Sequence, residues 1–196
     1  MYKLGITGGI GSGKSTASEF FEKNGAEVFN ADREAKKHLK HTKILQNRII
    51  TAFGQRIVEN NKLSIKKLAE VAFSNKIDQN ILNGLMWPEV FILVEKAMSE
   101  AREKGVKLFV VDAAMIFEAN FKHMFNSTLL ISTRKSIRLD RALKRKNLHL
   151  EQIQNRMSLQ MSESEKKKKA SDIITNEGSK ENFLKKLNIF LKSLSI

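Results

Sequence analysis

A glycine-rich loop near the N-terminus constrains the fold of this chain more than any other feature. The loop, Gly8–Ser15, reads GGIGSGKS and fits the pattern G-x-x-x-x-G-K-[ST]. It follows an apolar run, Tyr2–Thr7, that predicts a strand, and it opens a helical pattern, Lys14–Asn24. A glycine-rich turn that binds nothing is the alternative. Four glycines and a Lys-Ser pair at a strand-to-helix junction meet the whole mechanical requirement of a phosphate-binding loop, so we predict one here.

Both the backbone and the side chains of this P-loop suit the phosphates of a nucleotide. Glycines let several backbone N–H groups point at phosphate oxygens, and the helix N-terminus adds the positive end of its dipole. We expect Lys14 to reach the β- and γ-phosphates of ATP, Ser15 to place its hydroxyl on Mg²⁺, and Thr16 to help hold the α-phosphate. The other loop residues expected to bind ATP are Gly9, Gly11, Ser12 and Gly13.

Further short apolar runs predict the rest of the sheet. They alternate with helical patterns and lie at 26–29, 107–111, 127–131 and 172–175. Five such strands alternating with helices predict an α/β fold with a doubly wound parallel sheet, whose ligand binds at the carboxyl ends of the strands. We expect a single domain. Its core would comprise 1–32, 105–133 and 170–196, and two helical segments would be inserted into it, 33–104, broken by Gly54, Asn60-Asn61 and Pro88, and 134–169.

Composition narrows the class of protein. Lysine and arginine outnumber aspartate and glutamate by 35 to 21, a net charge of +14, which favours an anionic partner. There is no cysteine, which excludes disulfides and thiolate metal sites and favours a reducing compartment. No secretory signal and no membrane-spanning run is recognisable. We therefore expect a cytoplasmic protein without membrane contact, a monomer or small homo-oligomer.

One fragment offers a GTPase interpretation. Asn75–Asp78 spells the guanine-reading N-K-x-D, but it closes a helical pattern instead of ending a late buried strand. We interpret it as a turn between helices. An ATPase motor would need extra strands and sensors for which 196 residues leave little room. Small-molecule kinases remain.

Two acidic residues follow predicted strands next to the P-loop. Asp32 comes after the second strand, where a carboxylate could orient and deprotonate an acceptor hydroxyl; its alternative role is the N-cap of the helix from Arg33 onward. Asp112 closes the strand Leu108–Val111 in the manner of a Walker B acid and could hold Mg²⁺ through water; its alternative is a simple strand-end turn residue.

The segment 133–170 carries twelve basic and four acidic residues. Four of its arginines, Arg134, Arg138, Arg141 and Arg145, recur at helical spacing along one face. Such a face can close over ATP, supply charge to the transferring phosphoryl group and exclude water. A nucleic-acid surface or a solvated basic face is the alternative. For the run Lys166–Lys169 we prefer the solvated helix face.

Several phrases resemble one family, dephospho-coenzyme A kinase, in the family's order along nearly the whole chain. The phrase 7–16, TGGIGSGKST, is more specific than a bare P-loop, and 112–118, DAAMIFE, lies where the family has a strand end followed by Pro-Leu-Leu-aromatic-Glu. Further matches are Leu63, Leu68, Ala69 and Phe73 in the middle segment, the lid arginines, Arg156–Gln160 as Arg-x-x-x-Gln, and 170–178 as the last strand and adenine-side loop.

The resemblance implies one P-loop kinase domain, in which 33–104 would be the acceptor-binding subdomain and 134–169 the lid. It also implies a reaction. The acceptor would be the ribose 3′-hydroxyl of dephospho-coenzyme A, the products coenzyme A and ADP, and the cofactor Mg²⁺. Asp32 would be the base, Arg141 a catalytic lid residue, Arg138, Arg145 and Asn176 nucleotide-binding residues, and Ser15 and Asp112 the metal-binding pair. The chain departs from the family pattern at Asn30, Ser64-Ile65, Trp87 and Ala114.

Two other functions stay open at this point. A kinase of the same architecture could act on another nucleotide-like or phosphorylated acceptor, which the departures permit. A nucleotide-regulated nucleic-acid-binding module is the other; only 7% of the residues are aromatic and no basic-aromatic alternation suits base stacking, so we expect no nucleic acid partner.

Overall fold

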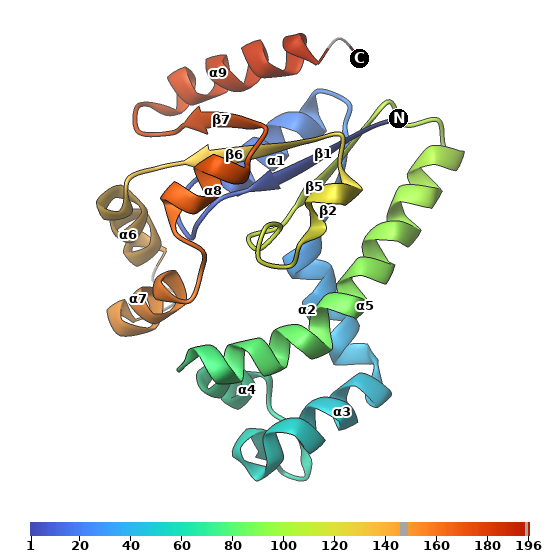
Figure 1. Cartoon of the computed structure of the whole chain (residues 1–196), viewed down its shortest axis with the longest axis vertical. Helices are drawn as coiled ribbons and strands as arrows, with labels where there is room; N and C mark the ends of the chain where they lie inside the picture. Colours follow the sequence, from blue (N-terminus) through green and yellow to red (C-terminus); the bar gives the residue numbers. More distant parts are fainter. Residues whose placement is uncertain (146–148, 195) are drawn as a thin grey trace.

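Five parallel strands form the centre of the molecule, in the order β2-β5-β1-β6-β7 (Figure 1). The computed structural model describes residues 1–145, 149–194 and 196; Lys146, one of the basic lid residues, lies outside them. The strands are β1 (Tyr2–Thr7), β2 (Glu27–Asn30), β5 (Leu108–Asp112), β6 (Ser127–Ser132) and β7 (Asp172–Thr175). The predicted five-stranded parallel sheet is confirmed, with β2, β5 and β6 ending one residue later than predicted.

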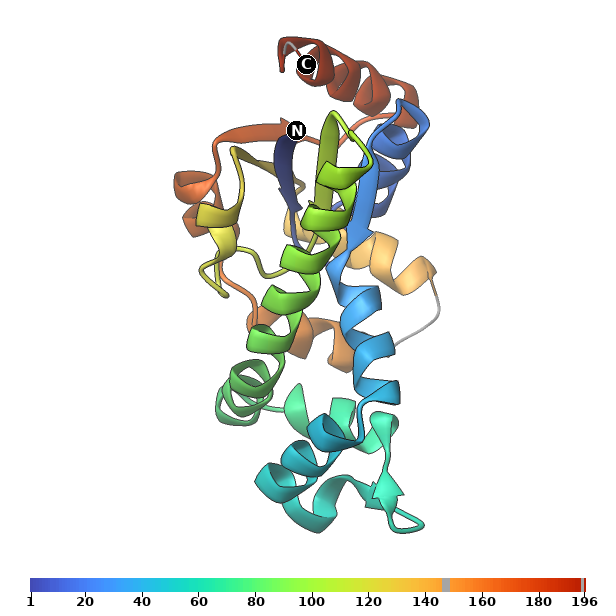
Figure 2. The ribbon, with the colours of Figure 1, turned by 90° about the vertical axis from the view of Figure 1, so that its right-hand side faces the viewer.

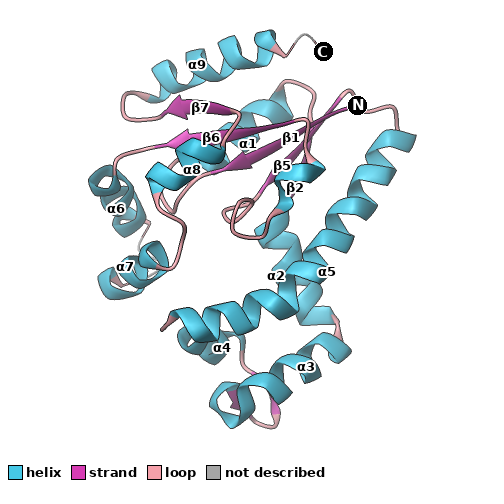
Figure 3. Cartoon of the chain, viewed as in Figure 1, coloured by secondary structure: helices cyan, strands magenta, loops and turns pink. Residues whose placement is uncertain are grey.

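Helices cover both faces of the sheet, which Figure 3 shows between them. Successive side chains of a strand point to opposite faces, so Leu108 and Val110 of β5 belong to a different core cluster from Phe109 and Val111. The first cluster includes side chains of α1 (Lys14–Lys23) and α9 (Lys180–Ser193), and the second those of α5 (Lys76–Glu103). Helices packed on both faces hold the sheet in place, and with it the strand ends that lie beside the P-loop.

The segment between β2 and β5 forms a helical insertion that projects away from the sheet in both views (Figures 1 and 2). It has a core of its own, which includes Leu45, Ile49, Phe53 and Leu68. Its elements before α5 are α2 (Ala31–His41), α3 (Lys43–Phe53), η1 (Gly54–Ile57), β3 (Val58–Glu59), β4 (Lys62–Leu63) and α4 (Ile65–Ala72).

The expected break at Asn60-Asn61 is confirmed, and one other expectation for this insertion is wrong. Asn60 and Asn61 both have positive φ, 50° and 57°, and they turn the antiparallel hairpin β3–β4. Pro88 does not end a helix, because α5 continues through it. Figure 1 shows α5 bent, as a proline inside a helix predicts, since it removes one backbone donor and crowds the carbonyl four residues earlier.

The segment 134–169, for which we predict the role of a lid, consists of short helices that follow β6. They are α6 (Lys135–Lys144), α7 (Leu150–Ser158) and α8 (Glu163–Lys169), and a further short helix, η2 (Phe121–Met124), precedes β6. In the described part of the chain, no helix combines the length and the apolar character that crossing a membrane requires.

Candidate active site

The P-loop joins β1 to α1 at the carboxyl edge of the sheet, as its sequence predicts. Gly13 begins the helix with φ of +103°, a conformation that favours glycine. A side chain there would also collide with the amide nitrogen of Asn176. The Nζ atom of Lys14 donates to the carbonyl of Gly8 at 3.0 Å, so the ammonium folds back over the loop that is expected to hold the phosphates.

A set of hydrogen bonds behind the loop fixes its backbone. Asn176, buried, donates its Nδ2 to the carbonyl of Ser12 at 2.8 Å, and the Thr133 hydroxyl is 3.2 Å from the same oxygen. Arg141 in turn donates to the carbonyl of Asn176 at 3.1 Å. The lid helix α6 is thereby linked to the P-loop through the end of β7. Sequence reasoning missed Thr133, although it directly follows a buried strand at the ligand-binding edge.

Asp112 ends β5 in a buried position, 3% exposed. Its Oδ2 accepts from the Ser18 hydroxyl at 2.9 Å and from the Asn30 amide at 3.3 Å. Burial raises the pKa of Asp112; the Lys14 charge and the Ser18 hydrogen bond oppose this, while the Asp32 charge adds to it. Within the described residues, Oδ1 accepts no hydrogen bond from protein.

Asp32 lies in the first turn of α2, exposed. The N-cap of this helix is Asn30, whose Oδ1 accepts from the backbone N–H of Arg33 at 2.8 Å. The alternative in which Asp32 caps the helix is therefore wrong. Among residues 1–145, 149–194 and 196, no donor bonds the Asp32 carboxylate, which leaves it open to a ligand beside Asp112.

The lid arginines have separate partners instead of forming one exposed face. Arg138 is buried: its Nε donates to the Thr133 carbonyl at 3.0 Å, and its guanidinium occupies the space where a side chain on Gly9 would lie. Arg145 is exposed at the end of α6, and Arg134 forms a 2.7 Å ion pair with Glu177.

The lysine run 166–169 contradicts expectation at its first member. Lys166 is 1% exposed, and its Nζ donates to the Ala114 carbonyl at 2.8 Å and to Glu118 Oε1 at 3.0 Å. The solvated-face interpretation is wrong for Lys166 and correct for the three exposed lysines that follow. Spacing alone could not separate them, because the inward position depends on how α8 packs.

The interpretation of the N-K-x-D fragment as a turn between helices is wrong: Asn75 is the N-cap of α5 and the next three residues form its first turn. The Asn75 side chain caps this helix by accepting from the backbone N–H of Asp78 at 2.9 Å. Asp78 is 3.2 Å from Arg56 and is buried in the insertion. Asn75 and Asp78 therefore make these contacts within the helical insertion.

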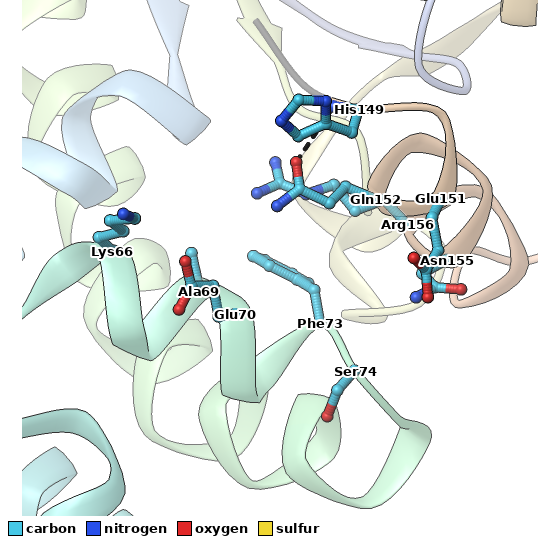
Figure 4. Close-up of a pocket in the computed structure, with 10 residues that line it drawn as sticks. All are labelled: Lys66, Ala69, Glu70, Phe73, Ser74, His149, Glu151, Gln152, Asn155 and Arg156. Atoms are coloured by element: carbon cyan, nitrogen blue, oxygen red, sulfur yellow. Dashed lines mark hydrogen bonds between the residues drawn. The ribbon is translucent and has the colours of Figure 1, made fainter.

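A cavity of about 740 Å³ lies between α4 of the insertion and α7 of the lid (Figure 4). Phe73, Lys66 and Glu70 line it from one side and His149 and Arg156 from the other. The Arg156 guanidinium stacks 4.6 Å from the centre of the Phe73 ring, and burial lowers the pKa of Arg156. Its size is within the range of small-molecule sites, and its lining carries both basic side chains, Lys66 and Arg156, and acidic ones, Glu70 and Glu151.

Comparison with known proteins places this geometry in one family. The sequence model of the family described as dephospho-CoA kinase matches residues 2–182. A dephospho-CoA kinase of Salinibacter ruber is 35% identical over 91% of this chain and 90% of its own. The structure of dephospho-CoA kinase from Campylobacter jejuni superposes with a TM-score of 0.69 at 27% identity, covering 98% of this chain and 96% of the other. The structure of TT1252 from Thermus thermophilus gives 0.81 at 28% identity, covering 98% and 97%. The chain belongs to the dephospho-CoA kinase family.

Proposed function

We propose that this chain transfers the terminal phosphoryl group of ATP to the ribose 3′-hydroxyl of dephospho-coenzyme A, yielding coenzyme A and ADP. One observation carries the proposal: the family match spans residues 2–182 and so includes the P-loop, the helical insertion and the lid together. A P-loop by itself would not identify the acceptor. The family match also covers the helical insertion, which would bind the acceptor.

The roles of the chain's own residues follow from their positions. Lys14 neutralises charge on the β- and γ-phosphates when it leaves the Gly8 carbonyl. Asp32, exposed at the strand edge, accepts the proton of the attacking hydroxyl. Arg141 and Arg145 belong to the lid that closes over the nucleotide, while Arg138 and Asn176 hold the P-loop backbone from Gly9 to Gly13 in its binding shape.

The donor set around Asp112 fits Mg²⁺, which prefers oxygen ligands and keeps several waters. Ser15 offers an exposed hydroxyl at the start of α1, and Asp112 keeps Oδ1 free of protein hydrogen bonds within the described residues. Ser15 and Asp112 would hold the ion, directly or through water. When bound with ATP, the ion neutralises phosphate charge.

The cavity between α4 and α7 suits the remote part of the acceptor. Lys66, His149 and Arg156 supply basic groups there, and dephospho-coenzyme A carries a pyrophosphate. Binding of the pyrophosphate in this cavity would help to orient the ribose of dephospho-coenzyme A, because binding energy from parts of a substrate that do not react can be used to position the reacting group.

The test is ADP release with Mg²⁺-ATP in the presence and absence of dephospho-coenzyme A, beside a panel of nucleosides and nucleoside monophosphates. Dephospho-coenzyme A should raise ADP release well above background, and adenosine monophosphate should do so poorly. A better acceptor elsewhere in the panel would overturn the substrate and leave the reaction class standing. Lys14→Ala should abolish turnover in a folded protein, while Lys23→Ala, at the exposed end of the same helix, should not.

A further inference from the structure

Lys166 is a buried ammonium to which the reaction above gives no role. It is 1% exposed, among the least exposed of the large side chains, on a short helix whose next three lysines are exposed. Burial lowers its pKa, the partner Glu118 opposes this, and the charge of Lys14 lowers it further.

Lys166 contacts the segment that follows β5, close to the metal-binding end of that strand. Its Nζ donates to the Ala114 carbonyl at 2.8 Å. The same carbonyl accepts from the hydroxyl of Thr7 at 3.2 Å, and Thr7 is the last residue of β1 before the P-loop. One carbonyl oxygen thus joins the lid, the β5 end and the entry to the P-loop.

Glu118 holds a second part of the lid. Its Oε1 lies 3.0 Å from Lys166 Nζ and also accepts from the backbone N–H of Met161 at 2.9 Å. Met161 belongs to the connector 159–162 between α7 and α8. From the opposite side, Lys76 of the insertion donates to the carbonyl of Leu159 at 3.0 Å. The connector therefore bonds both to the segment that follows β5 and to the insertion.

The connector places a side chain against the phosphate loop. A Cβ atom built on Gly9 would lie 3.5 Å from Oε1 of Gln160 and would collide with the guanidinium of Arg138. Arg138 NH2 is 3.9 Å from Glu163, the first residue of α8. The position of Gln160 and Arg138 over Gly9 thus depends on how the connector and α8 are anchored.

Stability does not account for the pair. A buried ion pair loses solvation, and replacing both partners by neutral groups of similar size is often neutral or stabilising. A pair at this place is explained better by geometry, because small displacements at a reacting centre are costly.

We propose that Lys166 and Glu118 are positioning residues for phosphoryl transfer, which anchor the 159–162 connector so that Gln160 and Arg138 lie against Gly9 of the P-loop. This inference rests on the proposed function. It assigns a task to Glu118, the acidic end of the 112–118 phrase, and to one lysine of the basic run.

The test compares Lys166→Met and the double variant Lys166→Met/Glu118→Gln with the wild-type chain. The double variant removes both charges, so it should unfold near the wild-type temperature. If the pair positions the lid, both variants should show kcat lowered by ~10²-fold, with the KM for ATP changed by less than about threefold. Lys167→Met, an exposed neighbour on the same helix, is the matched control and should keep wild-type kcat.

Three results would overturn the inference: a double variant with wild-type stability and kcat, a loss confined to the KM for ATP, or failure of both variants to fold, which would make the pair structural. A wild-type chain that prefers another acceptor would instead overturn the proposed substrate. The same variants, assayed with that acceptor as the substrate, would still test whether Lys166 and Glu118 are positioning residues.

Discussion

The Nδ2 atom of Asn30 donates a hydrogen bond to Oδ2 of Asp112 at 3.3 Å, across paired ends of β2 and β5. Since Asn30 also caps α2 through Oδ1, one amide fixes both the helix that carries Asp32 and the carboxylate proposed for the metal. The neutral amide of Asn30 donates a hydrogen bond to the buried Asp112 carboxylate, whereas a carboxylate at position 30 would repel it.

Asn30→Asp should make stability depend on Mg²⁺. Aspartate caps a helix as well as asparagine does, so the main change is loss of the hydrogen bond to Asp112 and a like-charge contact. The variant should unfold at a lower temperature without Mg²⁺ and gain more than the wild type when Mg²⁺ and ATP are added. Thermal unfolding with and without the ion measures this. Asn80→Asp, exposed near the start of α5, controls for the added charge.

Asp32→Asn should lower kcat by ~10²–10⁴-fold with little change in the KM for ATP, because the lost proton acceptor acts in the transition state. Its stability should stay near wild type, since Asn30 and not Asp32 caps α2. Steady-state kinetics with dephospho-coenzyme A and a thermal melt check both parts. Glu34→Gln, in the same first turn, is the control; an unimpaired Asp32→Asn enzyme would place the base elsewhere.

Asn176→Ala should loosen the P-loop from behind. The buried amide donates to the Ser12 carbonyl at 2.8 Å, and its removal should cost about 1–3 kcal/mol of stability. ATP affinity should fall as well, because the Gly9–Gly13 backbone loses a support. Denaturant unfolding and calorimetric titration with ATP measure the two effects. Asn182→Ala, exposed in α9, provides the comparison; equal ATP affinity in both variants would remove Asn176 from the support of the loop.

Asp78→Asn should destabilise the insertion at neutral pH. The Asn75 amide and then Arg56 donate to the Asp78 carboxylate and hold its pKa below the ordinary value. A lowered pKa stabilises the fold above the unfolded-state pKa, about pH 4, and this stabilisation is lost as the pH falls through the lowered value. Wild type and variant should therefore differ at pH 7 and converge in acid. Unfolding midpoints across this range check it, with Asp140→Asn, an exposed ion-pair residue of α6, as control.

Local sequence determined the elements whose conformation depends on near neighbours. The P-loop between Thr7 and Thr16 needs glycines at set places and a Lys-Ser pair at the helix start, so its position and its strand–loop–helix setting are readable from the residues alone. Fully buried parallel strands appear as short apolar runs, which is why the five-stranded sheet was predictable. The phrases 7–16 and 112–118, which resemble one family, likewise allowed the activity to be predicted from the sequence.

Tertiary structure decided which of several similar residues face inward. Nothing in the run Lys166–Lys169 distinguishes Lys166, whose burial follows from the packing of α8 against Glu118 and Ala114. Asn30 and Asp112 are 82 residues apart, and only the register of β2 on β5 joins them. Contacts at such separation depend on the whole fold, because loop closure and core packing set them together. The sequence by itself therefore established a P-loop kinase, whereas the tertiary structure decided which side chains contact the P-loop and the Asp112 carboxylate and which lysine of α8 is buried.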